Sequence, residues 1–227
     1  MRTWWTVRLL AAVLVVASMG FQTVTAQVVP NLQFMGFSAN IAPADKLECR
    51  QSIAYALDRE TIARTVAPVA PLPTSAAIAI QHPRLPGYNP AVRGYRYDST
   101  KAKELFAQCG WTGPITISVS SASDRFVTTL RASVTESLSR TLGPAVSVQI
   151  FGSVGDLARA GKEGKIPIYM FGWGADARDF GYPSFALGIA HEVVNDPEVR
   201  ALVDKRDAGA VEQMLLDKAL IIPVIYY

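Results

Sequence analysis

Hydrophobic positions recur at two periods along the chain and predict strands alternating with helices. Alternating or continuously apolar runs predict strands over 31–38, 115–120, 146–151, 166–171 and 220–227. Apolar spacings of three and four predict helices over 45–66, 101–109, 125–142 and 156–160, followed by helices beginning near 196 and 208. Asp98 or Ser99 can cap a helix start, and Gly110 and Gly143 mark helix ends.

The strands and helices between 115 and 171 alternate one by one. This β-α-β-α-β order predicts an α/β fold with a mostly parallel sheet covered by helices. Residues 68–98 carry six prolines with apolar residues between them, which indicates a long ordered loop or lid. Pro223 places the last strand at an edge or at the start of a sheet, because proline cannot donate to a ladder.

The first 26 residues have the pattern of a secretory signal. Arg2 and Arg8 precede an uncharged, mostly apolar run, and Val24 and Ala26 are small residues at the positions that a signal peptidase reads. An uncleaved membrane anchor is the alternative, but polar residues interrupt the run before it reaches about 20 residues. We therefore expect a signal peptide over 1–26 and one exported domain over 27–227, periplasmic or secreted.

Composition and residue spacing exclude several classes of function. Of the 227 residues, 50% are hydrophobic and 18% are charged, which excludes a disordered chain. The net charge is only +3 and no basic face is clustered, so no nucleic-acid partner is expected. The two histidines, His82 and His191, are far apart and have no metal-ligand spacing. No catalytic constellation is present either, so neither an enzyme nor a bound cofactor or metal is predicted.

Two cysteines leave two readings open. Cys49 and Cys109 are 60 residues apart and can form a disulfide in an oxidising compartment. Alternatively, both are buried free thiols that pack as small hydrophobes. The helix around 50–59 carries Arg50, Asp58 and Arg59, which we expect in surface and inter-element salt bridges.

The stretch Gly172-Trp173-Gly174-Ala175-Asp176-Ala177 follows a predicted strand. A nucleotide site would need a helix next, and Pro183 stands where that helix should run. A binding loop fits better, because ligands of parallel sheets bind beyond the carboxyl ends of the strands. Trp173 would supply an aromatic wall and Asp176 a carboxylate for a ligand cation. The alternative is a core tryptophan, with Asp176 and Asp179 as loop caps.

Several motifs in order resemble the family 5 extracellular solute-binding proteins, the peptide-binding components of ABC importers. The stretches that carry the resemblance are Phe34-Met35-Gly36-Phe37-Ser38, the helix Arg50 to Glu60 (RQSIAYALDRE), Tyr97-Asp98 with Lys101 to Leu105, Gly110-Trp111, Gly172 to Asp176 with Asp179, Asp196 to Val199, and Ile222 to Tyr226.

The resemblance implies a single periplasmic-binding-protein-like lobe that captures a small molecule or peptide and works with ABC permease subunits. By the same resemblance Asp176 anchors the ligand's ammonium group. The neighbouring Trp173, Gly174 and Asp179 belong to the same ligand loop. Arg178 is a candidate partner for a ligand carboxylate, with a solvated loop charge as the alternative.

The chain departs from the family in length. Complete members carry a first lobe of roughly two hundred residues or more ahead of the motifs matched here, so we expect the second lobe only. Ligands of such proteins are enclosed between two lobes. A lone lobe is therefore expected to expose its opening and closing strands, and these would invite self-association or a second chain supplying the missing lobe. A protein-interaction module and an inactive truncated copy remain the alternatives.

Overall fold

The computed structural model describes residues 30–92, 94–143, 146–174 and 184–227. The predicted signal peptide, residues 1–26, and Asp176, Arg178 and Asp179 of the ligand loop lie outside these ranges. The strands are β1 (Asn31–Phe37), β2 (Ser75–Ala76), β3 (Ile115–Ser120), β4 (Val146–Gly152), β5 (Ile168–Gly174) and β6 (Ile221–Tyr226). The helices are α1 (Leu47–Ala56), α2 (Arg59–Val66), the 3-10 turn η2 (Ala67–Val69), α3 (Ser99–Cys109), α4 (Arg125–Leu142), α5 (Val154–Lys162), α6 (Phe185–Val193), α7 (Pro197–Asp204) and α8 (Ala208–Asp217).

The described strands form one six-stranded sheet in the order β2-β6-β1-β5-β3-β4. β3 pairs in parallel with both β4 and β5, as the alternation of strands and helices between 115 and 171 predicts. β1 pairs antiparallel with β5 and β6, and β2 pairs antiparallel with β6. The α/β class is confirmed, but the expectation of a mostly parallel sheet is wrong. The chain inserts its first and last strands in the middle of the sheet, where they run against their neighbours.

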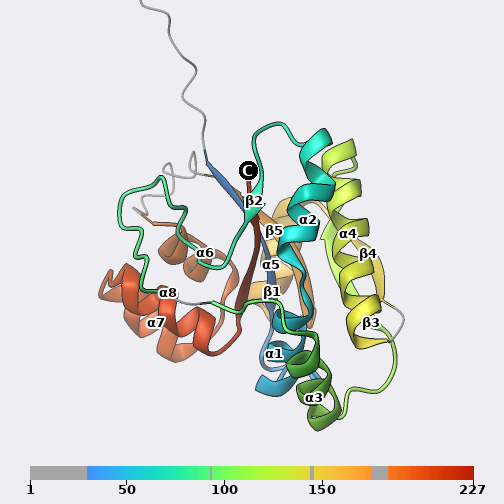
Figure 1. Cartoon of the computed structure of the whole chain (residues 1–227). Helices are drawn as coiled ribbons and strands as arrows, with labels where there is room; N and C mark the ends of the chain where they lie inside the picture. Colours follow the sequence, from blue (N-terminus) through green and yellow to red (C-terminus); the bar gives the residue numbers. More distant parts are fainter. Residues whose placement is uncertain (1–29, 93, 144–145, 175–183) are drawn as a thin grey trace, which may run out of the picture.

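Helices cover both faces of the sheet (Figure 1). One core lies between the sheet and helices α5, α6, α7 and α8. The other lies between the sheet and helices α1, α2, α3 and α4. β1 and β6 are buried along almost their whole length between the two cores. The expectation that a lone lobe exposes its opening and closing strands is therefore wrong, because both strands are inner strands with a helix layer on each side.

The helix expected over 45–66 is in fact two helices. α1 ends at Ala56, and Asp58 caps α2 by accepting a hydrogen bond from the Thr61 amide at 3.1 Å. Helix α6 is absent from the helices predicted above, which include none between residues 160 and 196. By contrast, α4 and β3 have the predicted bounds.

Two arginines in the 50–60 motif are buried and bind backbone carbonyls. Arg59, only 4% exposed, donates to the carbonyls of Pro223 at 2.7 Å, Ala54 at 3.1 Å and Leu57 at 3.2 Å. Arg50 donates to three other carbonyls, those of Ala44, Asp45 and Lys218. The expected salt bridges of these arginines are therefore wrong, because their helices turn them inward. Asp58 does lie 3.5 Å from the Arg140 guanidinium at the surface.

β6 contains an irregularity that changes which face its residues occupy. Gln33 pairs with Ile225 and Phe34 pairs with Pro223, so Val224 is one extra residue on β6. An extra residue inverts the in-and-out alternation of a strand beyond it. Val224 and Ile225 thus lie in the same core, and the following Tyr226 turns to the opposite face. Pro223 is tolerated in this inner strand because β2 pairs only with residues 225 and 226.

The structure joins Cys49 of α1 to Cys109 at the end of α3 in a disulfide, with the two Cα atoms 5.2 Å apart. Lys46 reinforces the junction by donating its ammonium to the Cys109 carbonyl at 2.7 Å. Gly110 follows in a left-handed conformation (φ 68°) and ends α3 as predicted. The bond ties two helices of the same layer across a sequence separation of 60 residues.

Replacing the buried guanidinium should weaken the whole fold. Arg59→Met is expected to lower the free energy of unfolding by on the order of 3 kcal/mol, because three buried carbonyls lose their donor. Urea denaturation followed by circular dichroism measures the change. Arg64→Met, on the exposed side of the same helix, is the matched control and should stay within about 0.5 kcal/mol of the parent. Equal losses in the two variants would contradict the role assigned to Arg59.

Removing the disulfide should also destabilise the chain. The double variant Cys49→Ala/Cys109→Ala is expected to have a free energy of unfolding about 4 kcal/mol lower than that of the parent. The reason is that the disulfide closes a long loop and so restricts the unfolded chain, and the variant's unfolded chain regains that entropy. Reductant should shift the urea midpoint of the parent toward that of the variant and leave the variant unchanged. A parent midpoint that does not respond to reductant would refute the expectation.

Candidate functional site

The candidate ligand loop begins at the end of β5. Its first two predicted residues, Trp173 and Gly174, are the last two of that strand. The other three, Asp176, Arg178 and Asp179, lie outside the described residues, so their roles stay predictions. The next described element is α6, which begins at Phe185 with Ser184 as its cap.

Trp173 lies in the core under α6. Its side chain is 8% exposed and belongs to the cluster between the sheet and helices α5 to α8. A Cβ atom added at Gly188 of α6 would lie 2.6 Å from Cζ2 of the indole. The helix therefore needs glycine at this position to lie so close to the ring. Trp173 was expected to be either a wall of the ligand site or a core residue, and its burial fits the core residue. Its packing holds the end of β5 against α6. Contact of Trp173 with a ligand stays a prediction.

Several chain segments meet at the edge of the sheet where β5 ends. β3, β4 and β5 run in the same direction, and β6 shares it because both β5 and β6 are antiparallel to β1. Gly174 pairs with Asn31, and Asn31 exchanges backbone hydrogen bonds of 2.8 and 3.0 Å with Tyr227. The carboxyl ends of four strands thus lie together at the edge where ligands of α/β sheets bind.

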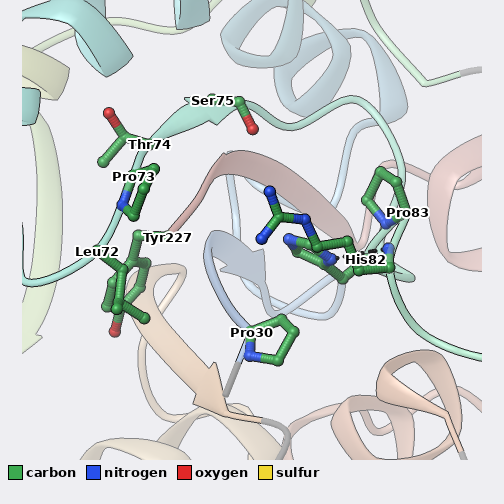
Figure 2. A pocket seen from close by; sticks show the side chains of 9 residues that line it. Pro30, Leu72, Pro73, Thr74, Ser75, His82, Pro83 and Tyr227 are labelled. Atoms are coloured by element: carbon green, nitrogen blue, oxygen red, sulfur yellow. Dashed lines mark hydrogen bonds between the residues drawn. The ribbon is translucent and has the colours of Figure 1, made fainter. Parts of the chain in front are cut away.

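A cavity of about 300 Å³ opens at this edge (Figure 2). It is lined by Pro30, Leu72, Pro73, Thr74, Ser75, His82, Pro83, Arg84 and Tyr227. In Figure 2, Leu72, Pro73 and Tyr227 lie opposite His82 and Pro83. Sequence reasoning missed this cavity. The signal that was available is the proline-rich segment 68–98, which was expected to be an ordered loop or lid.

The residues that line the cavity in the described part of the chain carry one cationic side chain, Arg84, and no acidic side chain. Arg84 and His82 are its titratable basic groups, and the only phenol is that of Tyr227. Burial, followed by the nearby Arg84 guanidinium, lowers the pKa of His82. The ring of His82 also packs edge-on against Tyr226, with centroids 4.7 Å apart, and its Nδ1 accepts a hydrogen bond from the Arg84 amide at 3.0 Å.

A buried polar network holds this wall in place. Glu212 of α8, only 3% exposed, accepts hydrogen bonds from the amides of Ile80 at 2.7 Å and Gln81 at 2.9 Å. Burial raises the pKa of Glu212, although these two hydrogen bonds act in the opposite direction. Tyr226 donates its hydroxyl to the Ala79 carbonyl at 2.5 Å. The segment just before His82 is therefore fixed by β6 and α8.

Gln81 connects the same wall to the start of α6. Its side-chain oxygen accepts a hydrogen bond from the Phe185 amide at 2.9 Å, and its side-chain nitrogen donates to the Pro86 carbonyl at 2.7 Å. Both interactions are buried or partly buried. The described residues on either side of 175–183 are thus anchored, by the Gly174–Asn31 pair at one end and by Gln81 at the other.

The described residues place no three His, Cys, Asp or Glu side chains where they can share a metal ion. Within the same ranges, no helix has the length and apolar character needed to cross a membrane. The cavity at the sheet edge offers the Arg84 guanidinium, the His82 ring and the hydroxyl groups of Thr74, Ser75 and Tyr227, and its volume is at the lower end of small-molecule sites.

Sequence comparison identifies the family. The model of bacterial extracellular solute-binding proteins, family 5 (middle region), matches residues 10–188, well over half of the chain. The chain belongs to this family. The resemblance carried by the ordered motifs is confirmed, and members of this family are solute-binding proteins of ABC importers.

Named relatives bind different solutes. Heme-binding protein A of Haemophilus influenzae is 27% identical over 158 residues, which cover 66% of this chain and 27% of the relative. The dipeptide-binding protein of Escherichia coli is 23% identical over 158 residues, or 66% of this chain and 28% of the relative. The chain therefore matches little more than a quarter of the length of either protein.

Solved structures confirm the fold. The murein tripeptide binding protein MppA of Escherichia coli superposes with a TM-score of 0.67 at 17% identity, over 90% of this chain and 45% of that one. A dipeptide binding protein from Pseudoalteromonas sp. SM9913, in complex with Met-Leu, gives a TM-score of 0.62 at 18% identity over 87% and 44% of the two chains. The α/β lobe described here is thus the fold of slightly less than half of each of those proteins.

The contact between Trp173 and Gly188 can be tested by adding one methyl group. Gly188→Ala should lower the free energy of unfolding by about 1–3 kcal/mol, because the new methyl overlaps the indole. It should also change the near-ultraviolet circular dichroism of the buried tryptophan. The matched control is Gly155→Ala in α5, where only the Ser153 hydroxyl lies near the added atom, at 3.9 Å; this change should be neutral or slightly stabilising. A Gly188→Ala protein as stable as the control would contradict the packing described.

Proposed function

We propose that this chain is the ligand-capturing lobe of an ABC-importer solute-binding protein, that it works outside the cytoplasm with permease subunits, and that its ligands are peptides. The observation that carries the proposal is the meeting of the β5 end with a cavity of about 300 Å³, in a fold shared with peptide-binding proteins. A cavity of this size is at the lower end of small-molecule sites. Capture is non-covalent and requires no catalytic group.

In this proposal Asp176 pairs with the ammonium group of the ligand. Asp176 follows Gly174 by two residues, and Gly174 ends its strand at the edge that the cavity shares. A charge-assisted hydrogen bond to a terminal ammonium recognises any peptide regardless of its side chains. Asp179 and the backbone at Gly174 complete the loop. In this proposal the packing of Trp173 against α6 fixes the start of the ligand loop. Arg178 is available for a negative group of the ligand.

Calorimetric titration with short peptides tests the Asp176 anchor. Asp176→Asn should weaken binding of Ala-Ala by on the order of tenfold, because the ammonium loses its ionised partner. N-acetylated Ala-Ala, which lacks that ammonium, should bind the parent and the variant equally. Asp204→Asn, a change of the same charge on α7, is the control and should leave the affinity for Ala-Ala unchanged.

The same titrations distinguish peptide capture from the two alternative functions of the chain. Binding of Ala-Ala that is the same in Asp176→Asn and the parent would remove the ammonium anchor. A folded chain that binds no peptide would favour an exported interaction module or an inactive truncated copy. Sedimentation then distinguishes these two, because an interaction module that pairs with itself or with a second lobe-supplying chain forms a complex and an inactive copy stays monomeric.

A further inference from the structure

The sheet has two edge strands, and they differ in how well they are protected. β2 is only two residues long and follows Pro71 and Pro73, so it offers few backbone groups to another strand. β4 is seven residues long and pairs only with β3 among the described strands. Figure 1 shows β4 beside α4 at the outer side of the molecule. Its outer row of amide and carbonyl groups therefore has no strand partner in the described part of the chain.

β4 also lacks the side chains that usually keep an edge strand from pairing. No residue from 141 to 155 is charged, and the strand itself contains no proline. The register of its ladder with β3 shifts only near its end, where Ser120 pairs with Gly152, so the segment before that point is regular. A long, regular and uncharged edge is the form of strand that most readily accepts a further strand.

Exposed apolar side chains concentrate on the same segment. Ile150 is 66% exposed, Val148 is 39% exposed, and Val154, just after the strand, is 53% exposed. Val148 and Ile150 pair with Ile117 and Val119 of β3, which belong to the core under α4, so all four lie on that face of the sheet. The edge thus presents apolar side chains to solvent together with its unpaired backbone.

A second copy of β4 matches this edge. Residues directly opposite each other in an antiparallel pair share one face of the sheet. With a two-fold axis at Gln149, Val148 of each copy lies opposite Ile150 of the other, so each exposed side chain gains an apolar neighbour. The two strands do not repel each other, because neither carries a charge. Such a self-complementary contact closes after two chains.

The contact area expected for this pairing is that of a weak dimer. Seven residues in an extended strand span about 24 Å, and a sheet layer is about 10 Å thick, which gives roughly 240 Å² for each copy. A standard stable interface buries about 800 Å² for each partner. The pairing should therefore be reversible and depend on protein concentration.

We propose that β4 is a homodimer interface, in which two copies pair their β4 strands antiparallel about Gln149 and join their sheets into one. The cavity described above includes Ser75 of β2, at the opposite edge of the sheet, so this pairing leaves the cavity open. The inference goes beyond the proposed function and does not depend on it.

Sedimentation equilibrium of the purified chain without peptide tests the dimer. The parent should pass from monomer to dimer between about 10 µM and 1 mM. Ile150→Lys should weaken the dimer by about tenfold or more, because the symmetry places the new charge in the contact twice. Leu47→Lys changes an exposed aliphatic residue of α1 in the same way and should dimerise like the parent. Thermal unfolding verifies that both variants are folded.

Cross-linking tests the register. Gln149→Cys places two thiols opposite each other, with Cβ atoms about 5 Å apart, close to the separation that a disulfide bridges. Ser147→Cys is the control, because the same symmetry sets its two copies four residues apart along the strands, or about 14 Å. The two natural cysteines are already joined, so the new thiol is the free one. Oxidised glutathione should give a covalent dimer of Gln149→Cys and little of Ser147→Cys.

Several results would overturn the proposal. They are a parent that stays monomeric at about 1 mM, a dimer that Ile150→Lys leaves unchanged, and equal cross-linking of the two cysteine variants. A weaker affinity of Ile150→Lys for Ala-Ala would also overturn it, because the edge would then accept a peptide and not a second copy. The sedimentation and cross-linking samples contain no peptide, so a failure of peptide capture leaves the dimer result readable.

Discussion

One fully buried guanidinium connects the parts of this lobe. Arg59 lies between the two helices of the 47–66 segment and the inner strand β6, and its partners are carbonyl groups. Burying a cation costs several kcal/mol unless its hydrogen bonds are satisfied. Burial lowers the pKa of Arg59 to about 10, so the group stays charged at neutral pH. The charge is thus retained inside the fold because three carbonyls from two different elements replace its water shell.

The irregularity in β6 links the buried Arg59 to the cavity on the other face of the sheet. Pro223 presents its carbonyl to Arg59, and the extra residue Val224 that follows it turns Tyr226 to the other face of the sheet. There the phenol holds the proline-rich segment through the Ala79 carbonyl and packs on His82. A motif that looks like an ordinary amphipathic helix in the sequence therefore helps to position the wall of the candidate site from the opposite face of the sheet.

The site itself was predictable only in part. The position of the ligand loop after a strand followed from local pattern, because glycines and aromatic residues cluster directly behind an apolar run. The cavity did not follow, because its lining comes from three segments that lie far apart in the sequence: Pro30, residues 72–84 and Tyr227. Their meeting depends on the antiparallel insertion of β1 and β6, which periodicity cannot reveal since it reports the burial of a strand and not its neighbours.

The sequence by itself determined the family and most local elements. Helix α4, strand β3 and the end of α3 at Gly110 fell where periodicity and capping placed them, because those signals act over a few residues. Tertiary structure alone decided the mixed sheet, the inward turn of Arg50 and Arg59, and the choice between a disulfide and free thiols at Cys49. These depend on contacts between residues far apart in the chain, and local spacing carries no information about which distant groups will meet.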